Sequence, residues 1–256
     1  MPIEPDLALP SFAVVVPMFN ERMGAERCVG EITRVLNSLS HRTALIVVDD
    51  GSTDGTAAIL HALSRTHAGL DVVTHPVNRG YGAALATGAR GVFDRGFEYA
   101  LFMDSDLTNS PDDIPRFAER MTERVDVIKA TRYSDGGSIL GVPFYRVAIS
   151  ATGNLIAKAL FRLPIHDCTN GFRAVRSTLL SRMRLTERDF AIIMEELYWC
   201  RFLAKRFAEV PVKLTNRADE QRSTSFAYRP SVFWRYFKYP LRAFAGVRPR
   251  GFKGVK

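Results

Sequence analysis

Two acidic pairs in this sequence each follow an apolar run, and carboxylates in that position suit a divalent metal ion. Asp104 and Asp106 lie one residue apart after the run 99–102, and Asp49 and Asp50 follow a second run. Carboxylate oxygens are ligands that Mg²⁺ and Mn²⁺ prefer, and bound Mg²⁺ usually shares its coordination sphere with substrate phosphates. The two pairs therefore predict a site for a metal ion and a phosphate-bearing ligand.

The residues around these pairs predict a sheet that would bring them to one edge. From residue 12 to about residue 130, short β-branched runs alternate with helical patterns, which is typical of a mostly parallel sheet covered by helices on both faces. We expect strands at 12–16, 44–48, 70–74, 97–103 and 125–130, and helices at 21–39, 53–67, 81–94 and 112–123. Ligands of open α/β sheets bind beyond the carboxyl ends of the strands, where both pairs would lie.

The pattern changes after residue 131. Helices are expected at 145–161 and 190–206, and a strand at 208–214. No internal repeat, low-complexity segment or linker divides the sequence. The expected organisation is one domain over residues 1–225, followed by a C-terminal extension over residues 226–256.

The C-terminal extension interleaves aromatic and basic side chains. Trp234, Tyr236 and Phe237, for example, alternate with Arg235 and Lys238. Rings at headgroup level with cations facing anionic lipid would suit a membrane surface. A helix packed on the domain with a solvated basic face explains the pattern equally well, so both interpretations stay open at this point.

The composition is that of a basic globular protein. Of 256 residues, 46% are apolar and 24% are charged, and the net charge is +8 with a pI near 9.6. This charge favours an anionic partner such as a nucleotide, a nucleic acid or an anionic membrane, or it reflects solubility alone. Because no nucleic-acid-binding motif accompanies the charge, nucleic acid is the weakest of these partners.

Cysteine usage and apolar runs bear on the compartment. The three cysteines are widely spaced and form no C-x-x-C pair, so we predict neither a disulfide framework nor a zinc site, and a reducing cytosol fits best. The N-terminus lacks the basic segment and apolar run of a signal peptide. No run of roughly 18 apolar residues would span a bilayer. We therefore expect a cytoplasmic protein.

Two loops at the same expected edge carry further candidates. Pro17 is expected to end the first strand, with Asn20 capping the next helix and Glu21 in its first turn. The functional alternative is that this edge binds a base or a ribose. Gly80 and Gly82 open a later helix, where the backbone can approach a ligand closely and the helix N-terminus attracts anions.

Helix capping alone does not explain the acidic pairs. Ser110 and Pro111 form an N-cap and N1 pair that specifies the next helix start, so Asp106 is not needed as a cap and is available for a metal. Two adjacent carboxylates at a strand end repel each other, and capping does not require both Asp49 and Asp50. The hydrogen-bond donors of a nucleoside would justify Asp50.

Taken in order, these motifs resemble the family 2 glycosyltransferases of GT-A fold. The resemblance runs from about residue 12 to residue 225 and rests on VVVPMFNE, VVDDGSTDGT, NRGYGAALATG, DSD and ATRY. Arg146 with Ser150 and Asn154, followed by DCTNGFR and EVPV, is similar to the branch of dolichol-phosphate mannose synthase and polyprenyl-phosphate glycosyltransferases. The resemblance implies a Rossmann-like, mostly parallel central sheet flanked by helices, and a basic aromatic helical C-terminal extension.

The resemblance also implies roles for single residues. Asp104 and Asp106 would hold a sugar-nucleotide with Mg²⁺ or Mn²⁺, and Asp106 would be the direct ligand. The nucleoside would be held by Pro17, Glu21 and Asp50, and Gly80 and Gly82 would let the backbone approach it. Arg132 would face a phosphate, and the sugar and acceptor side would be lined by Asp167, Arg173 and Glu195. Arg222 and Ser223 would close a loop over the phosphates.

Two positions depart from that branch. Thr108 stands where the branch has Gln, two residues after the second acidic ligand, and its hydroxyl is shorter. Residues 217–223 read RADEQRS where the branch has R-x-x-G-x-S-K, so the glycine and the lysine are missing.

The sequence therefore predicts an inverting, metal-dependent glycosyltransferase, peripheral on the cytoplasmic membrane face, that moves a hexose from a GDP-mannose or UDP-glucose type donor to a polyprenyl phosphate. Two alternatives stay open. One is the same donor chemistry on a soluble or saccharide hydroxyl. The other is a non-catalytic sugar-nucleotide-binding subunit.

Overall fold

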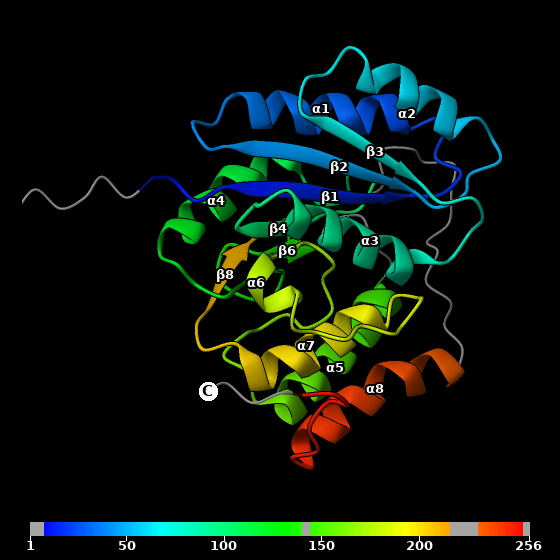
Figure 1. Ribbon diagram of the computed structural model, residues 1–256. Coiled ribbons are helices and arrows are strands. Elements are labelled where there is room, and N and C mark those ends of the chain that lie inside the picture. The colour runs from blue at the N-terminus through cyan, green and yellow to red at the C-terminus, as the bar shows by residue number, and fades with distance from the viewer. Residues whose placement is uncertain (1–7, 140–143, 216–229, 253–256) are drawn as a thin grey trace, which may run out of the picture.

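A mostly parallel sheet forms the centre of the molecule (Figure 1). The computed structural model describes residues 8–139, 144–215 and 230–252. Within them, the sheet order is β3 (Leu70–Thr74), β2 (Thr43–Asp49), β1 (Phe12–Met18), β4 (Tyr99–Phe102), β7 (Arg173–Arg176), β5 (Val127–Thr131) and β8 (Phe207–Pro211). β7 runs antiparallel to both of its neighbours, whereas the other pairs are parallel. The short strands β6 (Ser138–Ile139) and β9 (Lys213–Leu214) pair separately.

Helices cover both faces of this sheet because its strands are apolar on both sides. In β1, Phe12 and Val14 pack into one apolar cluster with α1 (Ala25–Asn37), α2 (Thr56–Ser64) and α4 (Ile114–Thr122). Ala13 and Val15 point to the other face, toward α3 (Tyr81–Asp94), α6 (Ser177–Leu180) and α7 (Ile192–Leu203). This alternation is the two-residue period of a strand buried on both faces.

Two further helices lie beyond α7 on the second face. α5 (Phe144–Phe161) and α8 (Pro230–Phe244) pack against each other, and α8 also contacts α7 (Figure 1). Tyr239 and Ala243 of α8 are buried in the same apolar cluster as α3. The C-terminal helix is thus packed on the domain. In the part of the chain that the structure describes, no helix is long and apolar enough to cross a membrane.

The expected alternation of strands and helices is confirmed, with three corrections. β1 continues through Pro17, which pairs with Val48, to Met18, so Pro17 does not end the strand. α1 begins at Ala25, so Glu21 precedes the helix, and Asn20 does not cap it. The strand β7 was not expected at all. Ser110 does cap the turn that precedes α4, accepting a hydrogen bond from the Asp112 N–H at 3.2 Å.

Candidate active site

The expected acidic pair Asp104 and Asp106 lies just beyond the carboxyl end of β4, in a loop held by its own hydrogen bonds. The Thr108 N–H and hydroxyl both donate to Asp106 Oδ1, at 3.1 and 2.9 Å. Asn170 Nδ2 donates to Asn109 Oδ1 at 3.3 Å, which ties this loop to the one before β7. Thr108, the departure noted in the sequence, therefore supports the Asp106 carboxylate directly.

The Asp104 carboxylate accepts a hydrogen bond from a tyrosine that is itself held in place. The Tyr81 hydroxyl donates to Asp104 Oδ1 at 2.8 Å, and the Tyr81 ring stacks on Phe190 with centroids 4.4 Å apart. A Cβ atom at Gly171 would lie 3.0 Å from Asp104 Oδ2 and 3.4 Å from the Tyr81 hydroxyl oxygen, so a glycine at this turn leaves room for both groups. Burial and the neighbouring Asp104 carboxylate raise the pKa of Tyr81 well above its ordinary value, so this hydroxyl keeps its proton and remains a donor.

The two carboxylates fit a hard divalent cation in their chemistry. Among the described residues, no group of three or more His, Cys, Asp or Glu side chains gathers to form a complete ligand set. Mg²⁺ is typically bound through one or two carboxylates, with substrate phosphates and water completing its shell. An acidic pair beside a cavity suits that arrangement, with Asp104 and Asp106 as the residues that would hold the ion.

Asp50 is buried and receives three hydrogen bonds from the protein. His75 Nδ1 lies 2.6 Å from its Oδ1, the Arg79 N–H donates at 3.0 Å and the Gly80 N–H at 2.7 Å. These contacts hold the start of α3 against the end of β2. A nucleoside that binds Asp50, as expected from the sequence, would therefore have to compete with these protein donors.

Its neighbour Asp49 is the other member of this acidic pair, for which no role of its own was expected. Asp49 is fully buried, and its Oδ1 accepts from the Ser52 N–H at 3.2 Å. Its Oδ2 has no hydrogen-bond partner among the described residues. A buried carboxylate oxygen without a donor is costly, so this atom marks a place where a ligand donor would be stabilising.

Glu21 lies near this edge through the loop after β1. The Glu21 N–H donates to Thr56 Oγ1 at 2.9 Å, and the neighbouring Asn20 exchanges hydrogen bonds with Ser52 and Thr53. The ends of β1 and β2 are also adjacent in register, Met18 beside Asp49. The structure thus brings the expected nucleoside residues of β1 and β2 together.

Gly80 and Gly82 have a different neighbour from the one expected. A Cβ atom at Gly80 would lie 2.4 Å from the Arg188 carbonyl oxygen, and one at Gly82 would lie 2.2 Å from that of Glu187. The Gly82 N–H also donates to the Arg188 oxygen at 2.8 Å. The close backbone approach that these glycines permit is therefore made by the protein's own segment 187–188.

Glu195 holds that segment in place. Its carboxylate accepts from the Thr186 N–H and hydroxyl, both at 2.7 Å, and from the Glu187 N–H at 2.8 Å. Lys238 and Tyr239 of α8 donate to the Glu187 carboxylate. Glu195 is buried and does not line the cavity formed by the described residues, contrary to the expected role at the acceptor.

Arg173 is also withdrawn from the cavity. It is fully buried and donates to both carboxylate oxygens of Glu196, and its third contact is with the Gly171 carbonyl oxygen at 2.7 Å. The guanidinium therefore neutralises a core carboxylate and supports the turn beside Asp104. This place differs from the expected one on the sugar side because α7 brings Glu196 against the start of β7.

Arg132 and Asp167 form a buried ion pair at the far side of the cavity. Arg132 follows β5 and donates to the two oxygens of Asp167 at 2.7 and 2.9 Å and to Thr169 Oγ1 at 2.6 Å. Burial alone would raise the pKa of Asp167, but the Arg132 charge and hydrogen bonds outweigh it and hold the pKa below its ordinary value. Asp167 is thus an ionised partner of Arg132.

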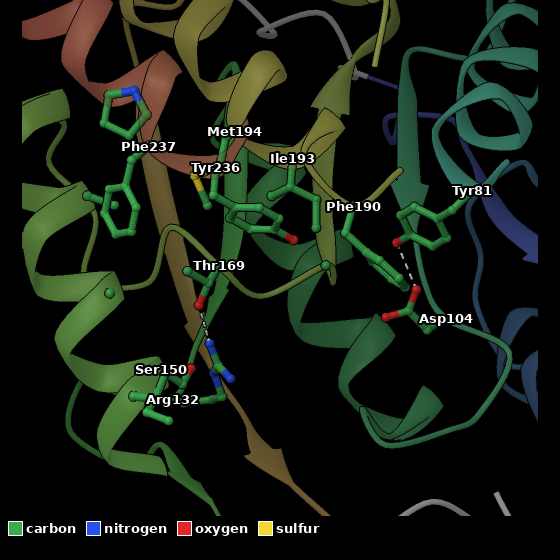
Figure 2. A pocket seen from close by; sticks show the side chains of 15 residues that line it. Tyr81, Asp104, Arg132, Ser150, Thr169, Phe190, Ile193, Met194, Tyr236 and Phe237 are labelled. Atoms are coloured by element: carbon green, nitrogen blue, oxygen red, sulfur yellow. Dashed lines mark hydrogen bonds between the residues drawn. The ribbon is translucent and has the colours of Figure 1, made fainter. Parts of the chain in front are cut away.

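A cavity of about 250 Å³ connects these two regions. Figure 2 shows Tyr81, Phe190 and Asp104 at one end and Arg132, Ser150 and Thr169 at another, with side chains of α7 and α8 between them. Its apolar lining comes from α5, α7 and α8: Ile149, Gly153, Ala157, Ile193, Met194, Tyr236, Phe237 and Pro240. The expected residues Arg222 and Ser223 lie outside the described residues, as does the side chain of Arg146.

This arrangement joins an acidic edge to the ion pair of Arg132 and Asp167 across an apolar wall. The acidic end suits a metal ion with a diphosphate. The Arg132 end offers guanidinium and hydroxyl donors, and the wall between the two ends suits an apolar chain.

The family model described as "Glycosyl transferase family 2" matches residues 13–184. A polyprenol monophosphomannose synthase of Mycolicibacterium smegmatis is 30% identical over 209 residues, covering 80% of this chain and 77% of that protein. An undecaprenyl-phosphate mannosyltransferase of Micrococcus luteus is 26% identical, covering 79% and 83%. A dolichol-phosphate mannosyltransferase of Pyrococcus furiosus is 29% identical, and the match spans 80% of this chain but 57% of that protein.

Solved structures show the same fold. Glucosyl-3-phosphoglycerate synthase from Mycobacterium tuberculosis, in complex with Mn²⁺, UDP and glucosyl-3-phosphoglycerate, superposes with a TM-score of 0.64 at 22% identity, covering 94% of this chain and 82% of that chain. The same enzyme with UDP alone gives a TM-score of 0.66 at 21% identity, with the same coverage. At this identity the likeness concerns the fold.

Proposed function

Because this chain belongs to glycosyl transferase family 2 and is therefore a glycosyltransferase, we propose that it moves a hexose from a nucleotide-sugar to a polyprenyl phosphate. Three relatives named for transfer of mannose to polyprenyl-type lipids support this acceptor class. The observation that carries the proposal is the cavity that runs from Asp104 to Arg132 along an apolar wall.

The donor belongs at the acidic end of the cavity. Asp104 and Asp106 would hold Mg²⁺ or Mn²⁺ together with the diphosphate of a GDP-mannose or UDP-glucose type donor. A bound divalent ion would stabilise the charge that develops on the departing nucleoside diphosphate. The nucleoside would extend toward the ends of β1 and β2, where Asp49 has an unpartnered buried oxygen and Pro17, Glu21 and Asp50 lie nearby.

The acceptor belongs at the Arg132 end. Its attacking oxygen would bond to the anomeric carbon opposite the departing diphosphate, so the configuration would invert. A lipid phosphate is already an anion and needs no strong general base, whereas an alcohol does. Asp167 and Glu195, the two carboxylates expected on the acceptor side, are the candidates for such a base, and both are engaged in hydrogen bonds within the protein. This favours a phosphate over a hydroxyl acceptor.

The outer faces of α5 and α8 provide a surface for the membrane in which such a lipid resides. Leu155, Trp234 and Phe244 are more than half exposed there. Arg235 and Arg242 lie on the same helix, and the Arg162 guanidinium lies 4.8 Å from the Phe244 ring centroid. Exposed apolar side chains among cations suit peripheral binding to an anionic bilayer.

A transfer assay tests this function. Wild type and Asp106→Ala are incubated with GDP-mannose or UDP-glucose, a polyprenyl phosphate, and Mg²⁺ or Mn²⁺. The expected result is lipid-linked sugar from wild type and its loss in the variant. Asp112→Ala serves as the control, because that carboxylate lies on the same loop but is exposed and paired with Arg34.

The other outcomes separate the alternatives. Nucleotide release without a lipid product would mean that the donor is cleaved with water as the acceptor, which would remove the lipid phosphate and leave a soluble or saccharide hydroxyl as the alternative. Donor binding without any turnover would indicate a non-catalytic sugar-nucleotide binder. Lipid product formed equally in the presence of a chelator would remove the metal from the proposal.

A further inference from the structure

We propose that Tyr81 is a positioning residue, which holds the Asp104 carboxylate in the orientation that receives a divalent ion with the donor diphosphate. This inference rests on the donor site of the proposed function. The Tyr81 hydroxyl donates to Asp104 Oδ1 at 2.8 Å and lines the same cavity, as Figure 2 shows. Tyr81 would act through Asp104 and would not need to touch the donor.

The turn at Gly171 lies beside the hydrogen bond between Tyr81 and Asp104. A Cβ atom at Gly171 would lie 3.0 Å from Asp104 Oδ2 and 3.4 Å from the Tyr81 hydroxyl oxygen, so the glycine leaves the space that this pair occupies. The Gly171 turn is itself fixed, because Arg173 donates to the Gly171 carbonyl oxygen and Lys129 to that of Asn170. The Tyr81 hydroxyl therefore meets Asp104 beside a fixed turn that has no side chain to displace either group.

Tyr81 can impose that orientation because its own ring is held. The ring stacks on Phe190, with 29° between the planes. The glycines on either side of Tyr81 pack under the segment 187–188, and Glu195 fixes that segment through three hydrogen bonds. The hydroxyl therefore reaches Asp104 from a rigid base, which is the condition for a hydrogen bond to select one side-chain orientation.

The same anchoring extends to the C-terminal helix. Lys238 and Tyr239 of α8 contact the Glu187 carboxylate, and Arg235 donates to Asp189 Oδ2 at 2.6 Å. The segment that supports Tyr81 is thus held between α8 and α3. The support for Tyr81 therefore includes contacts made by the C-terminal helix.

Removing such a hydrogen bond from a metal ligand typically lowers metal affinity by roughly 10- to 100-fold. Tyr81→Phe removes the hydroxyl and keeps the ring on Phe190, so it is the sharpest variant. Tyr99→Phe is the matched control: it deletes a buried hydroxyl that donates to the Val125 carbonyl oxygen at 2.7 Å, at the opposite end of β4.

The experiment measures binding of UDP and GDP by calorimetry, each with Mn²⁺ and with a chelator, for wild type and both variants. The quantity of interest is the ratio of the two affinities, which is the gain due to Mn²⁺. We expect Tyr81→Phe to reduce this gain about tenfold or more, while binding under chelator and the gain in Tyr99→Phe stay as in wild type. A general distortion of the site would instead weaken binding with and without Mn²⁺ alike.

An unchanged Mn²⁺ gain in Tyr81→Phe would overturn the inference, and so would an equal loss with and without the ion. The inference and the proposed function can fail separately. Wild type that makes lipid-linked sugar but shows no Mn²⁺ gain would overturn the role of Tyr81 and leave the function standing. A Tyr81-dependent Mn²⁺ gain in a protein that makes no lipid product would support the inference and remove the proposed acceptor.

Discussion

Arg173 donates to both carboxylate oxygens of Glu196, at 2.5 and 2.8 Å, in the buried centre of the molecule. The guanidinium also lies 4.3 Å from the centroid of the Phe102 ring, at the end of β4. This ion pair therefore joins β7, α7 and β4. Through the Gly171 carbonyl oxygen, Arg173 also holds the turn beside Asp104.

Removing one partner of this pair should destabilise the protein strongly. Glu196→Ala leaves the Arg173 charge buried without a counter-charge, and breaking a buried pair in this way typically costs about 3–5 kcal/mol. The measurement is the free energy of unfolding in urea. Asp112→Ala, which breaks the exposed pair with Arg34, should cost about 1 kcal/mol or less. A comparable cost in both variants would show that the buried pair contributes no more than a surface one.

Two glycine-to-alanine substitutions should shift stability in opposite directions. At Gly82 a Cβ atom would lie 2.2 Å from the Glu187 carbonyl oxygen, so Gly82→Ala must displace the segment 187–188, at a cost of about 1–3 kcal/mol. At Gly30, inside α1, no atom lies within 4 Å of the added Cβ, so Gly30→Ala should stabilise by up to about 1 kcal/mol. Urea unfolding measures both. Shifts of the same sign would contradict the packing described for Gly82.

Lys129 should make stability rise with pH in the alkaline range. Burial, and next the charge of Arg173, lower the pKa of Lys129 from 10.5 to about 8. Between these values the unfolded chain binds the proton that the folded protein has released, so the free energy of unfolding increases as pH rises.

The comparison is with Lys129→Met. The difference in the free energy of unfolding between wild type and this variant cancels the contributions of the other titrating groups. Between pH 8 and 10, the stability of wild type relative to this variant should rise by up to about 3 kcal/mol, since one pKa unit corresponds to about 1.4 kcal/mol. The measurement is urea unfolding at a series of pH values. A difference that stays constant with pH would contradict the lowered pKa of Lys129.

The exposed apolar residues of α8 should bind membranes. Trp234 is 66% exposed and Phe244 is 54% exposed, so the double variant Trp234→Ser/Phe244→Ser removes two large anchors from the surface formed by α5 and α8. Burying one such side chain contributes about 1.5–3 kcal/mol, so the partition coefficient should fall at least about tenfold. Sedimentation with phosphatidylglycerol vesicles measures it.

Phe93 provides the control for this surface, because it is 46% exposed but lies on α3. Phe93→Ser should sediment with vesicles as wild type does. Binding that is equally reduced by both changes would point to a general effect of surface hydrophobicity. Wild type that never sediments would contradict the membrane surface itself.

Much of this fold could be predicted because its strands are short β-branched runs buried on both faces. The expected bounds of β3 and α3 agree with the structure, Leu70–Thr74 and Tyr81–Asp94. β7 was missed because its four residues, with Arg173 and Arg176 at the two ends, have no strand signal of their own. They become a strand because they pair with β4 on one side and with β5 on the other.

The acidic edge could be predicted for a similar local reason, since Asp104 and Asp106 directly follow a strand. The surroundings of Glu195, Arg173 and the two glycines could not. Each depends on a partner far away in the sequence: Gly82 on Glu187, and Arg173 on Glu196. Residue type and spacing do not reveal such partners. The positions of α3, α7 and the segment 187–188 must be known first.

The antiparallel insertion of β7 also sets an order of assembly during synthesis. Chains fold from their N-terminus as they emerge, and β2, β3 and β4 each find their sheet neighbour among strands that have already been made. β5 cannot, because both of its neighbours, β7 and β8, come later in the chain. Arg132 directly follows β5. During synthesis, the half of the protein that carries Asp49 and Asp104 can therefore fold before the half around Arg132.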